Sequence, residues 1–215
     1  MKIVCVGWNY MSHAAEMERA LPEEPLIFLK PSTCIIGDGD EIRIPEGVTN
    51  VQHEVELALI LGKTGKNIPE SEAMSYVSGL AVFNDVTARD MQAADRAKGN
   101  PWDLCKGMDT FGPLSEIVPA EGIDIGDLEM VLTVNGEIRQ KVNTGRMIFS
   151  PARVIAYVSR YMTLEEGDIL ATGTPEGLLW LDDPMSTPEG ISEIKPGDIV
   201  CASISNIGSV TNKVV

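Results

Sequence analysis

The chain has 215 residues, of which 44% are hydrophobic and 23% charged, the composition of a soluble globular protein with one full hydrophobic core. Its 32 acidic residues outnumber 17 basic ones and give a net charge of −15, so nucleic acid is not an expected partner. The sequence has neither an apolar run of the ~20 residues that cross a bilayer nor a signal peptide, so we expect a cytoplasmic protein without membrane contacts.

The first half of the sequence predicts short strands separated by turns. A helix is expected over 12–20, with Ser12 as its cap, and a second over 87–97, with Thr87 as its cap and Gly99 at its end. Apolar or alternating runs predict strands over 2–6, 26–29, 41–44, 51–61 and 79–83.

The second half is rich in strands and contains one helix. Asn135-Gly136 between two alternating runs predicts a hairpin of strands 129–134 and 137–142. Ser150-Pro151 predicts a helix that continues to Met162. Two further strands are expected over 199–205 and 209–215, and no linker divides the chain. The pattern predicts a single α+β domain with much antiparallel sheet.

Two acids interrupt the long apolar run at 51–61. In a strand, Glu54 and Glu56 would point to one side and Val55 to the other, which places two carboxylates beside the core. Such a pair is unfavourable without a cation, because like charges repel and burial of a carboxylate is costly. A solvent-exposed strand face is the alternative.

Asp85 adds a third carboxylate where the apolar run 79–83 ends. Three carboxylates without cysteine suit a hard cation such as Mg²⁺, Mn²⁺ or Ca²⁺. The alternative for Asp85 is a helix cap or a turn residue before Thr87.

The chain has only two histidines, His13 and His53. On a helix, His13 and Glu16 would share one face, where a carboxylate can orient an imidazole that acts as a general base; a surface pair is the alternative. His53 would point away from Glu54 on a strand, and we expect a structural role for it.

Seven short segments in order make the sequence resemble the fumarylacetoacetate hydrolase family, specifically its small acylpyruvase and oxaloacetate decarboxylase branch. The segments are Gly7-Trp8-Asn9-Tyr10 with His13 and Glu16, Phe28 to Ser32, His53 to Leu57, Asn84 to Asp90, Lys106 with Phe111 to Pro113, Asn143 to Phe149, and Thr172 to Gly177. The sequence departs from the family at Trp8, where arginine is usual, and by an acidic insertion from about Leu181 to Glu193.

The resemblance implies a fold, a set of site residues and a metal. The fold would be a mixed β-roll with flanking helices, forming one catalytic domain over 1–215 whose first 45 or so residues carry a lid, and commonly a homodimer. Mg²⁺ or Mn²⁺ would be held by Glu54, Glu56 and Asp85. His13 and Glu16 would activate water, Lys106 would lie near the metal and the substrate, and the substrate would contact Arg89, Gln92 and Thr174.

The resemblance also implies a small 2-oxoacid substrate whose carbonyl the metal polarises. We expect hydrolysis of a C–C bond in an acylpyruvate, because the residues for a water-activating dyad are present. Decarboxylation or tautomerisation of oxaloacetate and isomerisation of a 2-oxo-dienedioate are alternatives. A non-enzymatic scaffold stabilised by a metal is a further alternative.

Overall fold

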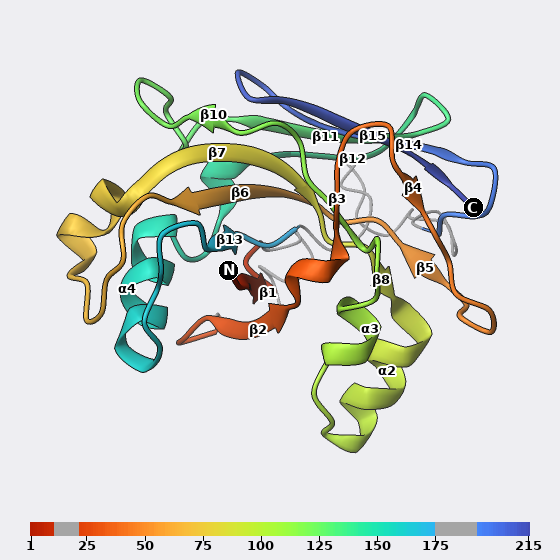
Figure 1. Ribbon diagram of the computed structural model, residues 1–215, viewed down its shortest axis with the longest axis horizontal. Coiled ribbons are helices and arrows are strands. Elements are labelled where there is room, and N and C mark those ends of the chain that lie inside the picture. The colour runs from red at the N-terminus through yellow and green to blue at the C-terminus, as the bar shows by residue number, and fades with distance from the viewer. Residues whose placement is uncertain (11–21, 175–192) are drawn as a thin grey trace.

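The computed structural model describes residues 1–10, 22–174 and 193–215 (Figure 1). The predicted helix over 12–20 and all but Glu193 of the insertion lie outside the described residues. The described chain has a mixed α+β fold with several sheets and few helices, as expected, and among its helices none is long and apolar enough to cross a membrane. The expected separation of a lid-bearing N-terminal part stays a prediction.

A six-stranded sheet forms the centre of the molecule. Its strands in spatial order are β10 (Val118–Pro119), β7 (Val77–Asn84), β6 (Val55–Leu61), β13 (Ile169–Ala171), β1 (Ile3–Gly7) and β2 (Leu26–Lys30). Only β1 and β13 pair in parallel; the other neighbours are antiparallel. The long β6 and β7 are curved in Figure 1.

A five-stranded sheet packs on one face of β6 and β7 and lies at the top of Figure 1. Its order is β12 (Glu137–Asn143), β11 (Glu129–Val134), β14 (Ile199–Ile204), β15 (Gly208–Val214) and β4 (Glu41–Ile42). The β11–β12 hairpin turns at Asn135 and Gly136, whose φ angles of 53° and 82° are those of a type I′ turn. The predicted hairpin is therefore confirmed.

The core divides at β6, whose residues are all buried. Alternate side chains such as Leu57 and Leu59 belong to the large cluster between the two sheets, while Ala58 and Ile60 belong to a smaller cluster on the opposite face. Because side chains alternate along a strand, Glu56 lies on the face of Ala58 and Ile60.

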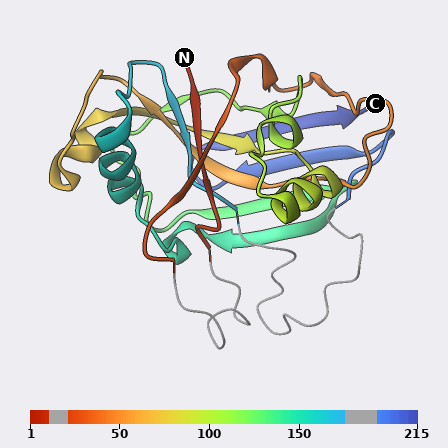
Figure 2. The same ribbon diagram turned by 90° about the horizontal axis from the view of Figure 1, so that it is seen from below.

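The helices lie at two ends of the molecule (Figure 2). Helix α4 (Pro151–Tyr161) packs against the 3₁₀ helix η2 (Glu70–Tyr76), and the Ser150 side chain accepts a hydrogen bond from Arg153 N as the predicted cap. Helices α2 (Arg89–Lys98) and α3 (Asp103–Lys106) pack together at the other end. The remaining short elements are η1 (Ser32–Cys34), η3 (Thr144–Arg146), the pair β3 (Ile35–Ile36) and β9 (Gly112–Pro113), and the pair β5 (Val51–Gln52) and β8 (Thr87–Ala88).

Three expected elements differ from the structure. The strand expected over 51–61 is broken at His53 and Glu54, because Glu54 N donates to the Asn84 side chain and Val55 N to the Gln140 side chain. Thr87 does not cap α2; it lies in β8, and its hydroxyl donates to Asp85 O. The strand expected over 41–44 ends at Ile42.

Candidate metal and substrate site

The pairing of β6 with β7 brings the three predicted acids together. Val55 at the start of β6 lies opposite Asn84 at the end of β7, so Glu54 just before β6 and Asp85 just after β7 meet at the same end of the ladder. Asp85 N donates to Glu54 O at 2.9 Å. Glu56 lies opposite Phe83, one pair further into the sheet.

These acids form a compact buried cluster. Glu54, Glu56 and Asp85 are 7%, 1% and 0% exposed, and each offers a carboxylate oxygen within 4.8 Å of the others. The alternatives of a solvent-exposed strand face and of a helix cap are therefore wrong. Antiparallel register places Asp85 beside Glu54, and Glu56 lies two residues further along the same segment.

Two buried lysines neutralise part of the cluster. Lys106 Nζ, from α3, lies 2.7 Å from Glu54 Oε2 and 2.5 Å from Asp85 Oδ2. Lys30 Nζ, from β2, lies 2.5 Å from Asp85 Oδ1 and donates to Phe111 O at 2.7 Å. Burial alone would lower the pKa of Lys106, but its carboxylate partners outweigh burial and raise it, so the ammonium stays protonated.

The three carboxylates do not share these cations equally. Burial would raise the pKa of Glu54, but Lys106 and Arg89 outweigh burial and lower it to about 2. Glu56 takes part in no ion pair between described residues, and its Oε2 accepts a hydrogen bond from Gly173 N at 2.9 Å. Burial and repulsion by Asp85 and Glu54 raise the pKa of Glu56 well above its usual range.

The cluster fits a hard divalent cation. All three candidate ligands are carboxylates, no cysteine contributes, and Glu56 is a buried acid without a cationic partner among the described residues. Mg²⁺ and Mn²⁺ prefer such oxygen ligands. A divalent cation held by Glu54, Glu56 and Asp85 would remove the repulsion that raises the pKa of Glu56.

Arg89, the first residue of α2, is fixed beside the cluster. Its guanidinium lies 2.5 Å from Glu54 Oε1 and donates to Gln52 Oε1 at 2.8 Å and to Gln92 Oε1 at 2.6 Å. Because these three described residues hold the guanidinium, it presents a fixed positive charge to the cavity. Gln92 therefore orients Arg89.

The segment after β13 closes another side of the site. Gly173 has a φ of 92°, and a Cβ at this position would lie 2.8 Å from Val6 O, so glycine is required both for the conformation and for the close approach. This backbone directs Gly173 N to Glu56 and places Thr174 where its Oγ1 accepts from Gln140 Nε2 at 3.0 Å.

His53 differs from its expected placement. It precedes β6, lines the same cavity as Glu54, and its Nδ1 lies 3.1 Å from Gln140 Oε1. Burial lowers its pKa to about 4, so the ring is neutral at pH 7. Its Nε2 is buried and has no hydrogen-bond partner among the described residues.

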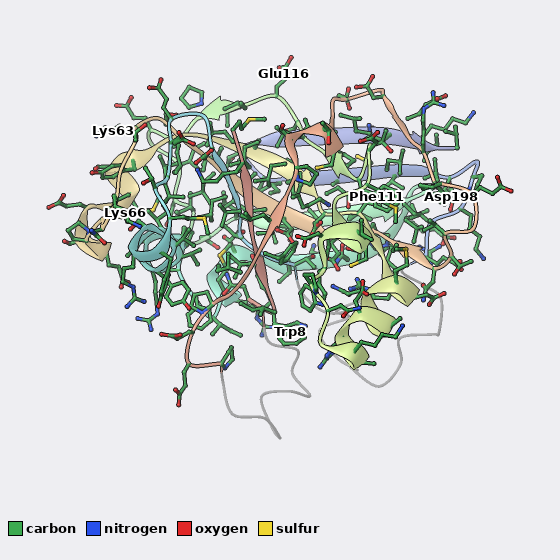
Figure 3. All side chains as sticks on the ribbon, turned by 60° about the horizontal axis from the view of Figure 1, so that its bottom comes forward. Trp8, Lys63, Lys66, Phe111, Glu116 and Asp198 are labelled. Carbon is green, nitrogen blue, oxygen red and sulfur yellow. The ribbon has the colours of Figure 1, made fainter. Side chains whose placement is uncertain are left out.

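The acids form part of the wall of a cavity of about 670 Å³. Aromatic side chains form another part: the ring centroids of Trp8 and Trp102 are 5.8 Å apart, and those of Phe28 and Trp102 are 5.6 Å apart. The Arg96 guanidinium lies over Trp8, 4.7 Å from the ring centroid. Figure 3 shows Trp8 beside α2 and α3.

The structure brings seven predicted site residues into this one cavity: Glu54, Glu56, Asp85, Lys106, Arg89, Gln92 and Thr174. The predicted dyad of His13 and Glu16 lies outside the described residues. Sequence reasoning gave no role to Lys30, Gln140 or Arg96. Lys30 was included in a family-like segment, but its burial depends on Asp85, 55 residues away.

Comparison with known proteins gives matches over the whole chain. The family described as "Fumarylacetoacetate (FAA) hydrolase C-terminal" matches residues 2–215. The mitochondrial oxaloacetate tautomerase FAHD1 of Arabidopsis thaliana is 44% identical over 210 residues, which cover 97% of this chain and 88% of that protein.

Two solved structures are also similar over the full length of the chain. Fumarylpyruvate hydrolase from Pseudomonas aeruginosa in complex with Mn²⁺ and pyruvate has a TM-score of 0.87 and 32% identity, with 100% of this chain and 89% of that chain covered. The 2-hydroxyhepta-2,4-diene-1,7-dioate isomerase from Mycobacterium marinum has a TM-score of 0.83 and 36% identity, with 100% and 74% covered.

Proposed function

Because the chain belongs to the fumarylacetoacetate hydrolase family, we propose that it is a divalent-metal-dependent enzyme that interconverts the keto and enol forms of oxaloacetate. The observation that carries this proposal is the buried cluster of three carboxylates with Lys106 and Arg89 in one cavity. The name of the 44% identical plant relative supports oxaloacetate as the substrate.

The metal and two basic side chains would have different roles toward a 2-oxoacid substrate. When bound, Mg²⁺ or Mn²⁺ supplies a Lewis acid that stabilises negative charge on the substrate's keto oxygen. Arg89, held by Glu54, Gln52 and Gln92, binds a substrate carboxylate. Lys106 stays protonated at Nζ and adds a fixed positive charge near the developing enolate.

Hydrolysis of an acylpyruvate is the second candidate reaction. It uses the same enolate chemistry and adds a nucleophilic water, for which His13 and Glu16 are the proposed dyad. The similar structure of fumarylpyruvate hydrolase in complex with Mn²⁺ and pyruvate favours this candidate. A scaffold without catalysis is disfavoured, because the acids form part of the wall of a large cavity.

One experiment separates these functions. Ketonisation of enol-oxaloacetate is followed by the loss of enol absorbance with Mg²⁺ or Mn²⁺, and pyruvate release from fumarylpyruvate and from a short acylpyruvate is measured in parallel. We expect catalysed ketonisation that excess chelator abolishes and that Glu56→Gln slows by roughly 10²-fold or more.

Glu41→Gln is the matched control, since half-buried Glu41 pairs with Arg43 at 2.6 Å and does not line the cavity. This variant should retain the wild-type rate. Pyruvate release without catalysed ketonisation would instead assign hydrolysis. Conversion of none of these substrates above the rate with free metal would contradict both enzymatic functions.

A further inference from the structure

The Gln140 side chain, from β12, is 3% exposed and contacts three groups of described residues at the cavity wall. Its Oε1 accepts from Val55 N at 3.0 Å and lies 3.1 Å from His53 Nδ1. Its Nε2 donates to Thr174 Oγ1 at 3.0 Å. One amide therefore links the start of β6, His53 and the turn after β13.

The orientation of this amide follows from its backbone partner. Val55 N can only donate, so the amide atom that faces it must be the oxygen, and the nitrogen must face Thr174. The Thr174 hydroxyl accepts this bond, and no described residue accepts a hydrogen bond in return from that hydroxyl. Its own hydrogen is thus available to a group in the cavity that Thr174 lines.

We propose that Gln140 is a positioning residue that keeps the Thr174 hydroxyl as a hydrogen-bond donor toward the substrate. This inference rests on the proposed function, because the carboxylate and keto oxygens of a 2-oxoacid only accept hydrogen bonds. A hydroxyl whose hydrogen pointed at its neighbour would present only lone pairs and would repel these oxygens. Gln140 prevents that arrangement by using its own N–H on Thr174.

The same amide fixes the tautomer of His53. Since Gln140 Oε1 is an acceptor, His53 Nδ1 must carry the proton, and the lone pair of the neutral ring lies on Nε2. This Nε2 is the buried nitrogen without a partner among the described residues. A measurement of the His53 tautomer therefore shows the orientation of the Gln140 amide, even when no substrate is converted.

Gln140→Glu tests the proposal with a side chain of nearly the same shape. A glutamate oxygen still accepts from Val55 N and His53 Nδ1, but the other oxygen accepts from the Thr174 hydroxyl and turns its hydrogen away from the substrate. In the Mn²⁺-loaded protein we expect the Kd of oxalate and the KM of the 2-oxoacid to rise about 10-fold or more, with a smaller change in kcat.

The double variant with Thr174→Val separates hydrogen-bond polarity from added charge. Thr174→Val alone should weaken oxalate binding to a similar extent, and Gln140→Glu added to it should cause no further loss. Repulsion by the new carboxylate would persist in both backgrounds. Additive losses, or oxalate binding by Gln140→Glu at the wild-type Kd, would overturn the proposal.

A measurement on the metal-free protein tests the amide independently. Nitrogen chemical shifts of His53 should show the Nδ1–H tautomer in the wild type and in Gln140→Glu, and a mixture of tautomers in Gln140→Leu; retention of the single tautomer in Gln140→Leu would contradict the geometry. Wild-type protein that shows this tautomer but neither binds oxalate nor converts a 2-oxoacid would refute the proposed function and the substrate role of Thr174, and not the amide orientation.

Discussion

Lys30→Met removes the most deeply buried charge partner of the site. The Lys30 side chain is fully buried, pairs with Asp85 Oδ1 at 2.5 Å and donates to Phe111 O at 2.7 Å and to Val86 O at 3.3 Å. Methionine fills a similar volume but donates to none of these oxygens. Removal of one partner from a buried ion pair costs about 3–5 kcal/mol. Lys106 still pairs with Asp85 Oδ2, but Asp85 Oδ1 then stays buried without its cation.

Urea unfolding of the metal-free protein at pH 7 measures this cost. A loss of about 4 kcal/mol is a large share of the ~5–15 kcal/mol that stabilises a typical domain. Lys213→Met, the same change at an exposed position of β15, should shift the unfolding free energy by less than about 0.5 kcal/mol.

A double variant tests whether the loss comes from the ion pair. Asp85→Asn removes the carboxylate charge, so Lys30→Met should destabilise that variant by about 2 kcal/mol less than it destabilises the wild type. A loss below about 1 kcal/mol for Lys30→Met alone would refute the reasoning, because the lysine would then be paired too weakly to matter.

Three further variants test the site and the fold. Gly173→Ala should destabilise the protein by about 2 kcal/mol more than Gly136→Ala, because both glycines have positive φ but only at position 173 would a Cβ clash, 2.8 Å from Val6 O; equal losses in urea unfolding would contradict this. His13→Ala should slow acylpyruvate cleavage by about 10²–10⁴-fold and leave Mn²⁺ affinity unchanged, whereas unchanged cleavage would exclude His13 as the base. Hydrogen bonds from Lys2 and Glu165 N outweigh burial and lower the pKa of Asp168. The resulting stability is present above the ordinary Asp pKa of about 3.9 and is lost as pH falls through the lowered folded value. Asp168→Asn should therefore cost ~2 kcal/mol at pH 7 and much less once the pH is below that folded value, and a cost independent of pH would refute the pairing.

Elements with local signals were predicted from the sequence. The Asn135-Gly136 turn and the Ser150 cap lie next to the elements that they define, so neighbouring residues suffice to predict them. The break at His53 and Glu54 was missed because its causes are distant. The side chain of Asn84 takes one backbone N–H and that of Gln140 takes the next, and neither is visible in a local pattern.

The same difference between local and distant signals applies to the candidate site. The acids were predicted because Glu54 and Glu56, two residues apart, share one side of an extended segment and Asp85 ends the next apolar run. The antiparallel pairing of β6 with β7 brings these two places together. The burial of Lys30 could not, because a lysine at the end of a strand is usually exposed and only the position of Asp85 shows otherwise. No sequence pattern indicated Gln140, since its proposed role depends on which of its two amide atoms faces Val55.

The charges of the site suit the anionic substrate proposed for this protein, although its net charge is −15. Three buried carboxylates are matched by Lys30, Lys106 and Arg89, so the described cluster is formally neutral. One bound divalent cation would give the cluster a charge of +2. This charge compensates the two negative charges of a dianion such as oxaloacetate when the dianion leaves water. The long-range field of an acidic protein is screened within about 8 Å at physiological salt, so the local charge decides what binds. On the proposed function, the three basic residues are therefore as necessary to substrate choice as the acids are to the metal.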